Sequence, residues 1–183
     1  MGALLTGKSL DDRVGHFVML EALRAAGTSR CEVHAAATAQ EEVGMRGARV
    51  AAERVRPDVG VAIDTCPSDD GPGAPAEGGG ARIGRGAAIR VADASALASR
   101  RLVDFLVALA GERGIPHQLH VSNRGGTDTH ALQLAGEGCV AGCISIPTRY
   151  VHSSVEACHP DDVSACIALT AALIEEAHRL DAG

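Results

Sequence analysis

Apolar and polar positions follow two different periods along this chain. Between residues 12 and 27, Val14, Phe17 and Val18 fall at helical spacing, and the pattern stops at Gly27. Similar patterns predict further helices at residues 46–55, 95–114, 127–138 and 160–180. Short apolar runs predict strands at residues 31–39, 59–64, 83–91, 116–121 and 139–147. Helices and strands therefore alternate along almost the whole chain.

This alternation predicts one α/β domain. Strands joined through helices are typical of a parallel sheet covered on both faces, so we expect a three-layer sandwich with a mainly parallel central sheet. Residues 66–82 contain the densest Gly and Pro and are interpreted as a loop rather than a domain linker. We therefore treat residues 1–183 as a single domain.

The composition supports a packed core and disfavours two classes of partner. Hydrophobic residues make up 46% of the chain and aromatic residues only 2%, so the core must be built from Ala, Val, Leu and Ile. The net charge of −6, without a basic, aromatic-rich stretch, disfavours nucleic-acid binding. No apolar run reaches the roughly 18 residues of a membrane span, and no signal-peptide pattern opens the chain. We expect a cytoplasmic protein with no nucleic-acid or membrane partner.

The cysteines indicate reduced thiols. None has a C-x-x-C spacing, and several lie inside apolar runs, so buried thiols are favoured over disulfides or a thiolate zinc site. The six are Cys31, Cys66, Cys139, Cys143, Cys158 and Cys166.

Metal-binding residue types gather at the ends of predicted strands and at the start of the first helix. These residues are Asp11, Asp12, Glu41, Glu42, Asp64 and His152. In open α/β sheets, ligands bind beyond the carboxyl ends of the strands, so these side chains could share one crevice. Carboxylates with an imidazole suit zinc, cobalt or manganese.

Each candidate also has an ordinary structural explanation. Glu41 and Glu42 could be a solvated pair that opens a helix, and one of the two aspartates before the first helix could cap it. Asp64 could begin an Asx-turn, and His152 could be an exposed loop histidine. Other histidines compete as ligands, namely His16, His34, His120 and His130. Spacing alone leaves these alternatives open.

Five motifs, in this order, resemble those of the cytosolic dinuclear-metal aminopeptidases, a group that includes tetrahedral and glutamyl aminopeptidases and proteins labelled endoglucanases. The motifs are KSLDDRVG, AQEEVGMRGAR, VAIDT, GGTDTHALQLAGEG and SIPTRYVHSSVE. They span nearly the whole chain. The resemblance implies a zinc-peptidase-like fold and an enzyme that removes N-terminal residues from peptides.

The resemblance also implies a role for each site residue. Asp11 would bridge two metal ions, and Asp64 would bind one of them. Glu42 and His152 would bind the other, while Glu41 would be the general base that activates the metal-bound water. Zinc is the expected ion, with cobalt and manganese as alternatives, at one or two ions per chain. The peptide bond between Asp11 and Asp12 is expected to be cis.

Three further residues would lie at the rim of the site and shape it for substrate. These are Thr127, Asp128 and Arg149. Turn and helix-cap chemistry is the alternative explanation for them.

The chain departs from the family pattern before Asp11. Family members carry additional strands there, an inserted β-domain used in assembly, and a His-x-Asp motif whose histidine binds the metal shared with Asp64. We find no counterpart of that motif before Asp11. The Asp64 site should therefore bind its metal weakly, and a sheet edge should be left bare, which favours a homo-oligomer or a second chain that supplies the missing half.

Three interpretations follow. The chain could be a working metallo-aminopeptidase, alone or completed by a partner chain. It could instead be a pseudoenzyme or assembly module that keeps the fold, or an inactive fragment of a longer aminopeptidase.

Overall fold

Six strands form one mixed sheet in the computed structural model, which describes residues 4–72 and 80–180. The strands are β1 Leu5–Gly7, β2 Val59–Pro67, β3 Ala87–Ala92, β4 His117–Val121, β5 Val140–Arg149 and β6 Glu156–Cys158. The α-helices are α1 Leu10–Ala25, α2 Arg46–Val55, α3 Arg100–Glu112, α4 Thr129–Gln133 and α5 Pro160–Glu176. Two 3₁₀ helices complete the set, η1 Glu41–Val43 and η2 Ala177–Arg179.

The strand β5 is the centre of the sheet. It pairs in parallel with β2, from Val59 opposite Val140 to Pro67 opposite Thr148. On its other side it pairs antiparallel with β3 and, further along, with β6. β3 pairs in parallel with β4, and β6 pairs antiparallel with β1. The α/β prediction is confirmed, with a sheet whose longest pairings are parallel and whose overall character is mixed.

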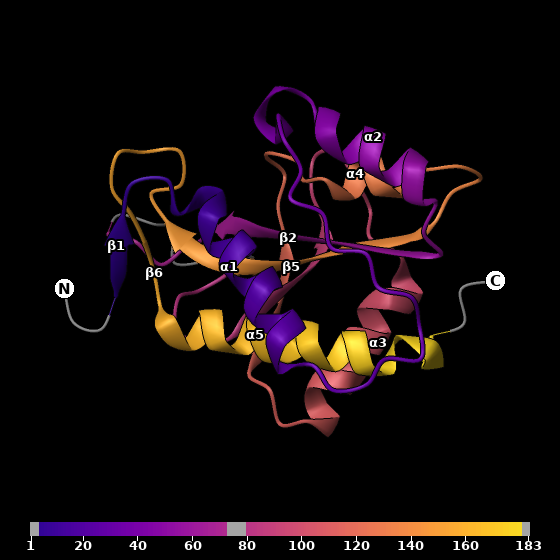
Figure 1. Cartoon of the computed structure of the whole chain (residues 1–183). Helices are drawn as coiled ribbons and strands as arrows, with labels where there is room; N and C mark the ends of the chain where they lie inside the picture. The colour runs from indigo at the N-terminus through magenta and orange to yellow at the C-terminus, as the bar shows by residue number, and fades with distance from the viewer. Residues whose placement is uncertain (1–3, 73–79, 181–183) are drawn as a thin grey trace.

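Helices cover both faces of this sheet, as predicted. Figure 1 shows α2 and α4 on one face and α1, α3 and α5 on the other. β5 lies between these layers, and every residue from Ala141 to Thr148 is buried. The largest fully buried apolar side chains include Ile89, Ile144, Leu106 and Leu169. The core is thus aliphatic, as the scarcity of aromatic residues requires.

The prediction of a strand at residues 31–39 is wrong. This segment has no regular secondary structure, and residues 32–37 are exposed. No backbone hydrogen bond joins residues 32–38 to any other described residue. A strand must pair its N–H and C=O groups with a neighbour. One edge of β2 is free among the described strands, but residues 32–38 make no backbone hydrogen bond to it and therefore form no strand.

Other differences concern short elements and boundaries. β1 and β6 were not predicted, because three residues are too few to show a period. α3 begins at Arg100 rather than at residue 95, since Ala96 and Ala98 instead hydrogen-bond to Asp93 and Val91. β2 continues beyond Asp64 to Pro67. Of the predicted loop 66–82, residues 73–79 lie outside the described part of the structure.

Within the described residues, no helix is both long and apolar enough to cross a bilayer.

Candidate metal centre

Three of the predicted ligands meet where β2 and β5 end. Nε2 of His152 lies 3.1 Å from Oδ2 of Asp11 and 3.2 Å from Oε1 of Glu42. The three residues come from different parts of the chain, namely the turn after β5, the start of α1 and the helix η1. One ligand atom from each lies within 4.8 Å of the other two, so they form a first ligand group.

A second ligand group shares Asp11 with the first. It consists of Asp11, Asp12 and Asp64, whose ligand atoms also lie within 4.8 Å of one another. Asp64 reaches it from β2, and the two aspartates reach it from the first residues of α1. Asp11 is therefore common to both groups.

The backbone at the start of α1 presents both aspartates. The Asp11–Asp12 peptide bond is cis, as expected, and both residues have non-helical φ and ψ angles. Oδ1 of Asp12 accepts a hydrogen bond from the backbone N–H of Gly15, 3.1 Å away. A Cβ atom at position 15 would lie 2.3 Å from Oδ2 of Asp12, so only glycine leaves room for this carboxylate.

The neighbouring glutamates lie on a tight 3₁₀ turn. Gly44, with φ of 116°, ends the turn, and the backbone N–H of Gly47 donates to the carbonyl of Ala39, 2.8 Å away. This closure places Glu42 beside His152. Glu41 is more buried and lies within electrostatic reach of Asp11 and Asp128. The two carboxylates therefore have different surroundings. Two solvated glutamates on a regular helix would both face water.

Crowding and burial disfavour the ionised carboxylates. Burial, reinforced by Asp64 and Asp11, raises the pKa of Asp12 to about 9. Burial and the charge of Asp11 raise the pKa of Asp64 to about 8, against the opposing effect of Arg90. Burial and Glu42 raise the pKa of Glu41 to about 7. A cation among these groups would offset their repulsion.

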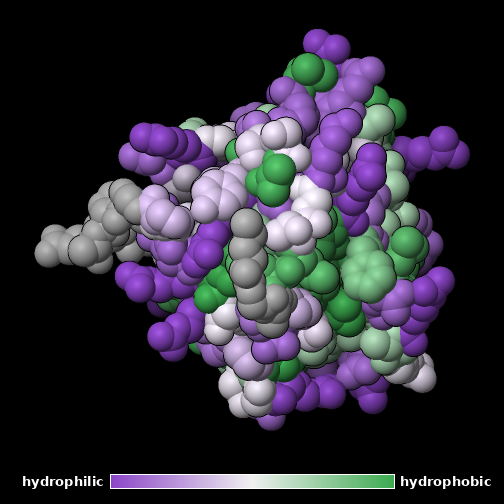
Figure 2. All heavy atoms as spheres, turned by 90° about the vertical axis from the view of Figure 1, so that its left-hand side faces the viewer, coloured by the Kyte–Doolittle hydropathy of each residue, from purple (hydrophilic) through white to green (hydrophobic). Residues whose placement is uncertain are grey.

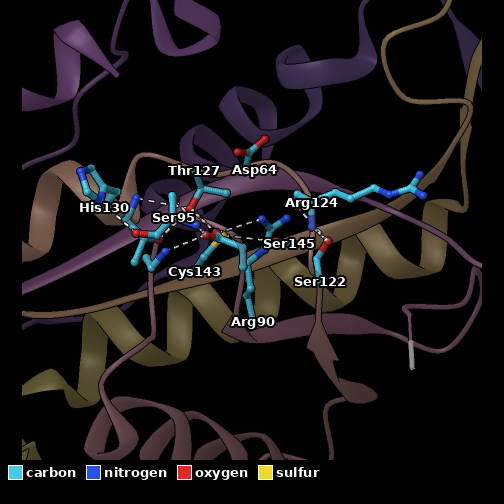
Figure 3. Close-up of polar contacts among 12 residues, drawn as sticks. Asp64, Arg90, Ser95, Ser122, Arg124, Thr127, His130, Cys143 and Ser145 are labelled. Atoms are coloured by element: carbon cyan, nitrogen blue, oxygen red, sulfur yellow. Dashed lines mark hydrogen bonds and ion pairs between the residues drawn. The ribbon is translucent and has the colours of Figure 1, made fainter. Parts of the chain in front are cut away.

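The buried Arg90 is linked to the metal centre by hydrogen bonds. Figure 3 shows Arg90 reaching from β3 toward the strand that carries Asp64. Its Nη2 donates to the carbonyl of Thr65, 3.0 Å away, and the Thr65 hydroxyl donates to Oδ1 of Asp11, 3.1 Å away. Nη1 of Arg90 lies 3.2 Å from Oδ2 of Asp93, and both side chains are buried. This hydrogen-bonded chain connects the core of the sheet to Asp11.

The three predicted rim residues have different surroundings. Thr127 is fully buried, and its hydroxyl lies 2.9 Å from that of Thr129. Asp128 accepts a hydrogen bond from the Thr38 hydroxyl, 2.6 Å away. Arg149, at the end of β5, pairs with Asp70 at 3.0 Å. Their roles toward a substrate stay predictions.

Of the competing histidines, His16 lies beside Asp12, with its Nδ1 3.9 Å from Oδ2 of that residue, and the other three lie elsewhere in the fold. The ring of His16 is hydrogen-bonded to the Asp12 carbonyl, and the ring of His130 is hydrogen-bonded to the Ser95 carbonyl. His34 pairs with Glu32. His120 is buried in β4. None of them joins a ligand group among the described residues.

One His-x-Asp triplet does occur in the chain, at residues 159–161, far beyond the position where the family carries its motif. There the ring of His159 accepts a hydrogen bond from the backbone N–H of Asp161 and caps α5. It joins neither ligand group.

Sequence reasoning missed one residue of the site and left another without a role. Asp12 was among the candidates but was assigned no ligand role, and in the structure it belongs to the second ligand group. Glu156 is buried, and its carboxylate accepts the backbone N–H groups of Asp11 and His152. A glutamate four residues after a candidate ligand gives no such signal, because the contact with Asp11 depends on the folded chain.

The residues fit a divalent cation. An ion bound tetrahedrally at about 2.1 Å has ligand atoms about 3.4 Å apart, close to the separations of His152 from Asp11 and Glu42. Two carboxylates and an imidazole suit zinc, and the three carboxylates of the second group suit a harder ion.

The face of the molecule at this end of the sheet combines polar and apolar surface. Figure 2 shows apolar side chains gathered in the middle of this face, with polar ones around them. Exposed apolar residues on the elements of this end include Leu5 of β1 and Val155 before β6. Such a surface is suited to a peptide or to another chain.

Comparison with known proteins identifies the family. The family model described as M42 glutamyl aminopeptidase matches residues 2–169. The lysyl aminopeptidase of Pyrococcus furiosus is 37% identical over 177 residues, which cover 94% of this chain and 49% of that protein. The glutamyl aminopeptidase of Lactococcus lactis is 31% identical over 163 residues, covering 88% of this chain and 44% of that protein.

Solved structures agree. The aminopeptidase APDkam598 of Desulfurococcus kamchatkensis matches with a TM-score of 0.92 and 41% identity, over 94% of this chain and 49% of that one. The TET1 peptidase of Pyrococcus horikoshii, described as assembling into a tetrahedron or a large octahedral shell, matches with a TM-score of 0.79 and 32% identity, over 96% and 51%. The chain thus spans about half the length of the relatives it matches. It belongs to the M42 glutamyl aminopeptidase family, as its motifs indicated.

Proposed function

We propose that this chain is a metal-dependent aminopeptidase-type hydrolase that removes N-terminal residues from peptides. The observation that carries the proposal is the shared position of Asp11, which lies in both ligand groups. Asp11 would bridge two ions, with Glu42 and His152 completing one site and Asp64 contributing to the other. Asp12, in the second group, is a further candidate ligand.

A divalent cation at this centre would supply Lewis-acid polarisation of the peptide carbonyl and would lower the pKa of water. Glu41 is the proposed acceptor of the proton from the attacking water. It belongs to neither ligand group, and its pKa of about 7 suits a general base at neutral pH. Its neighbour Glu42 contacts His152 and is assigned to metal binding instead.

The rim would help to position the peptide. Asp128 acts electrostatically on Glu41, so it lies near the proposed reacting atoms. Arg149 is held by Asp70 at the end of β5 and could contact substrate from there. Thr127 is buried, which supports an indirect role through the loop that carries Asp128.

Zinc is the proposed ion, with cobalt or manganese as alternatives and one or two ions per chain. The first ligand group includes an imidazole, whereas the second has only carboxylates among the described residues. The second site is therefore proposed to be the weaker one for zinc.

An inactive or partner-requiring module is the second candidate. It is favoured by the second ligand group, which consists only of carboxylates among the described residues. Residues 32–37 are exposed, and residues 32–38 make no backbone hydrogen bonds to other described residues. Both observations support pairing with another copy or with a chain that supplies the other half. We propose a cytoplasmic homo-oligomer or such a two-chain assembly.

Hydrolysis of aminoacyl chromogenic substrates tests the proposal. The protein is stripped of metal, reloaded with Zn²⁺ or Co²⁺, and assayed with metal content measured in parallel. We expect Glu41→Gln to lower turnover by about 10² to 10⁴-fold while metal stays bound, because only the proton acceptor is lost. Glu112→Gln, on an exposed face of α3, is the matched control and should retain full turnover.

The other outcomes are equally informative. Bound metal without turnover on any substrate would favour the second candidate. A Glu41→Gln variant as active as the parent protein would contradict the role of Glu41.

A further inference from the structure

The buried carboxylate of Glu156 connects two separate parts of the metal centre. Its Oε2 accepts the backbone N–H of Asp11, and its Oε1 accepts the backbone N–H of His152, each at 3.0 Å. One donor belongs to the start of α1 and the other to the turn after β5. These segments are 141 residues apart in sequence, from 11 to 152, and a single side chain holds both.

The position of Glu156 is itself fixed by the sheet. It is the first residue of β6, which pairs with β1 on one side and with β5 on the other. Only 2% of its surface is exposed. Its two described hydrogen bonds are both with backbone N–H groups, and no described cation pairs with it. A buried carboxylate is costly unless its oxygens are satisfied, so both bonds matter to its placement.

The backbone of His152 needs such support. Its φ of 64° lies in the left-handed region, which a residue with a Cβ atom seldom adopts. The bond from its N–H to Glu156 holds this conformation, in which Nε2 lies 3.1 Å from Asp11.

We infer that Glu156 is a positioning residue that sets the spacing of Asp11 and His152 and thereby the affinity of the first ligand group for its cation. It contacts the backbones of the two ligands rather than the cation. The inference rests on the proposed metal centre and concerns how two of its ligands are held in position.

The chain offers a matched control. Asp162 is another fully buried carboxylate, and it accepts the backbone N–H groups of Gly84 and Gly86, each at 2.7 Å. Like Glu156, it accepts two backbone N–H groups, but these bonds join the start of α5 to the loop before β3. Loss of its charge should disturb folding without changing the spacing of the metal ligands.

Calorimetric titration of the metal-stripped full chain with Zn²⁺ tests the inference. Glu156→Gln keeps the size of the side chain but turns one acceptor into a donor, which leaves an N–H group of Asp11 or His152 unpaired. We expect it to weaken Zn²⁺ binding by about 10 to 100-fold, the range seen when a residue that orients a metal ligand is changed. Asp162→Asn should bind Zn²⁺ within about twofold of the parent protein.

Co²⁺ gives a second readout, since its visible absorption reports the geometry of the ligands. The spectrum should change in Glu156→Gln and stay unchanged in Asp162→Asn. If Glu156→Gln does not fold, Glu156→Asp keeps both acceptor oxygens one methylene further from their donors and should show a smaller loss of affinity.

The outcomes separate this inference from the proposed function. Parent-like Zn²⁺ affinity in a folded Glu156 variant would overturn the role of Glu156 while leaving the metal centre intact. An equal loss in Asp162→Asn would overturn it too, because general destabilisation would then explain both. Absence of binding by the parent protein would instead overturn the metal centre itself.

Discussion

At the scale of residues, acidic side chains crowd the site, and one buried arginine, Arg90, lies next to them. Arg90 pairs with Asp93 and donates to the carbonyl of Thr65, beside Asp64. Burial tends to raise the pKa of Asp93, but the Ser95 N–H and hydroxyl and the Arg90 guanidinium outweigh it and hold the pKa below its usual value. Asp93 is therefore ionised at neutral pH and fixes the arginine.

Asp93→Asn should lower the free energy of unfolding at pH 7 by about 3 kcal/mol, since it leaves a buried arginine without its charged partner. The folded-state pKa lies below the unfolded-state value, so this contribution is present above about pH 4 and is lost as pH falls through the folded-state pKa. The variant should therefore lose less stability than the parent protein below pH 4. Urea unfolding from pH 7 to pH 2 measures both effects.

The exposed pair Arg100 and Asp104 provides the comparison. Asp104→Asn should change the free energy of unfolding by less than about 1 kcal/mol. Equal losses at pH 7 for the two variants would contradict the assigned importance of the buried pair.

At the scale of elements, the long strands and helices were predictable because each shows its period over many residues. β2, β5, α1 and α5 carry enough apolar positions to identify them, and the acids and histidine near their ends marked the site. Glu156, and the place of Asp12 in the second ligand group, could not be found this way, because both depend on tertiary packing. The prediction of a strand at residues 31–39 was wrong for a related reason. A strand-like pattern forms a strand only where a neighbouring strand pairs with its backbone N–H and C=O groups.

Hydrogen exchange tests this account of the segment. The amides of residues 33–37 should exchange at close to the unprotected rate in the isolated chain, because no described group bonds to them. Amides of residues 143–146, in the centre of β5, should be protected by orders of magnitude more. Mass spectrometry of peptides from the two regions gives both rates. Strong protection of residues 33–37 would show that another chain covers the segment.

At the scale of the whole molecule, the family, the sandwich of helices on a sheet and the first ligand group could all be predicted from the sequence. The mixed sheet order and the membership of Asp12 in the second ligand group required the structure. Among the described residues, one edge of β2 has no neighbouring strand, and residues 32–38 make no backbone hydrogen bonds. The proposed metal centre and the proposed assembly surface are thus different parts of one chain.

The most direct test of the central claim is the number of Zn²⁺ ions bound per chain, and their affinity, measured by calorimetry on the metal-stripped protein. We expect one tight ion at the group of Asp11, Glu42 and His152, and a weaker second ion at most. His152→Ala should abolish the tight phase, whereas His178→Ala, which removes an exposed histidine of η2, should leave it unchanged. Tight binding that survives in His152→Ala, or no binding by the parent protein, would contradict the account.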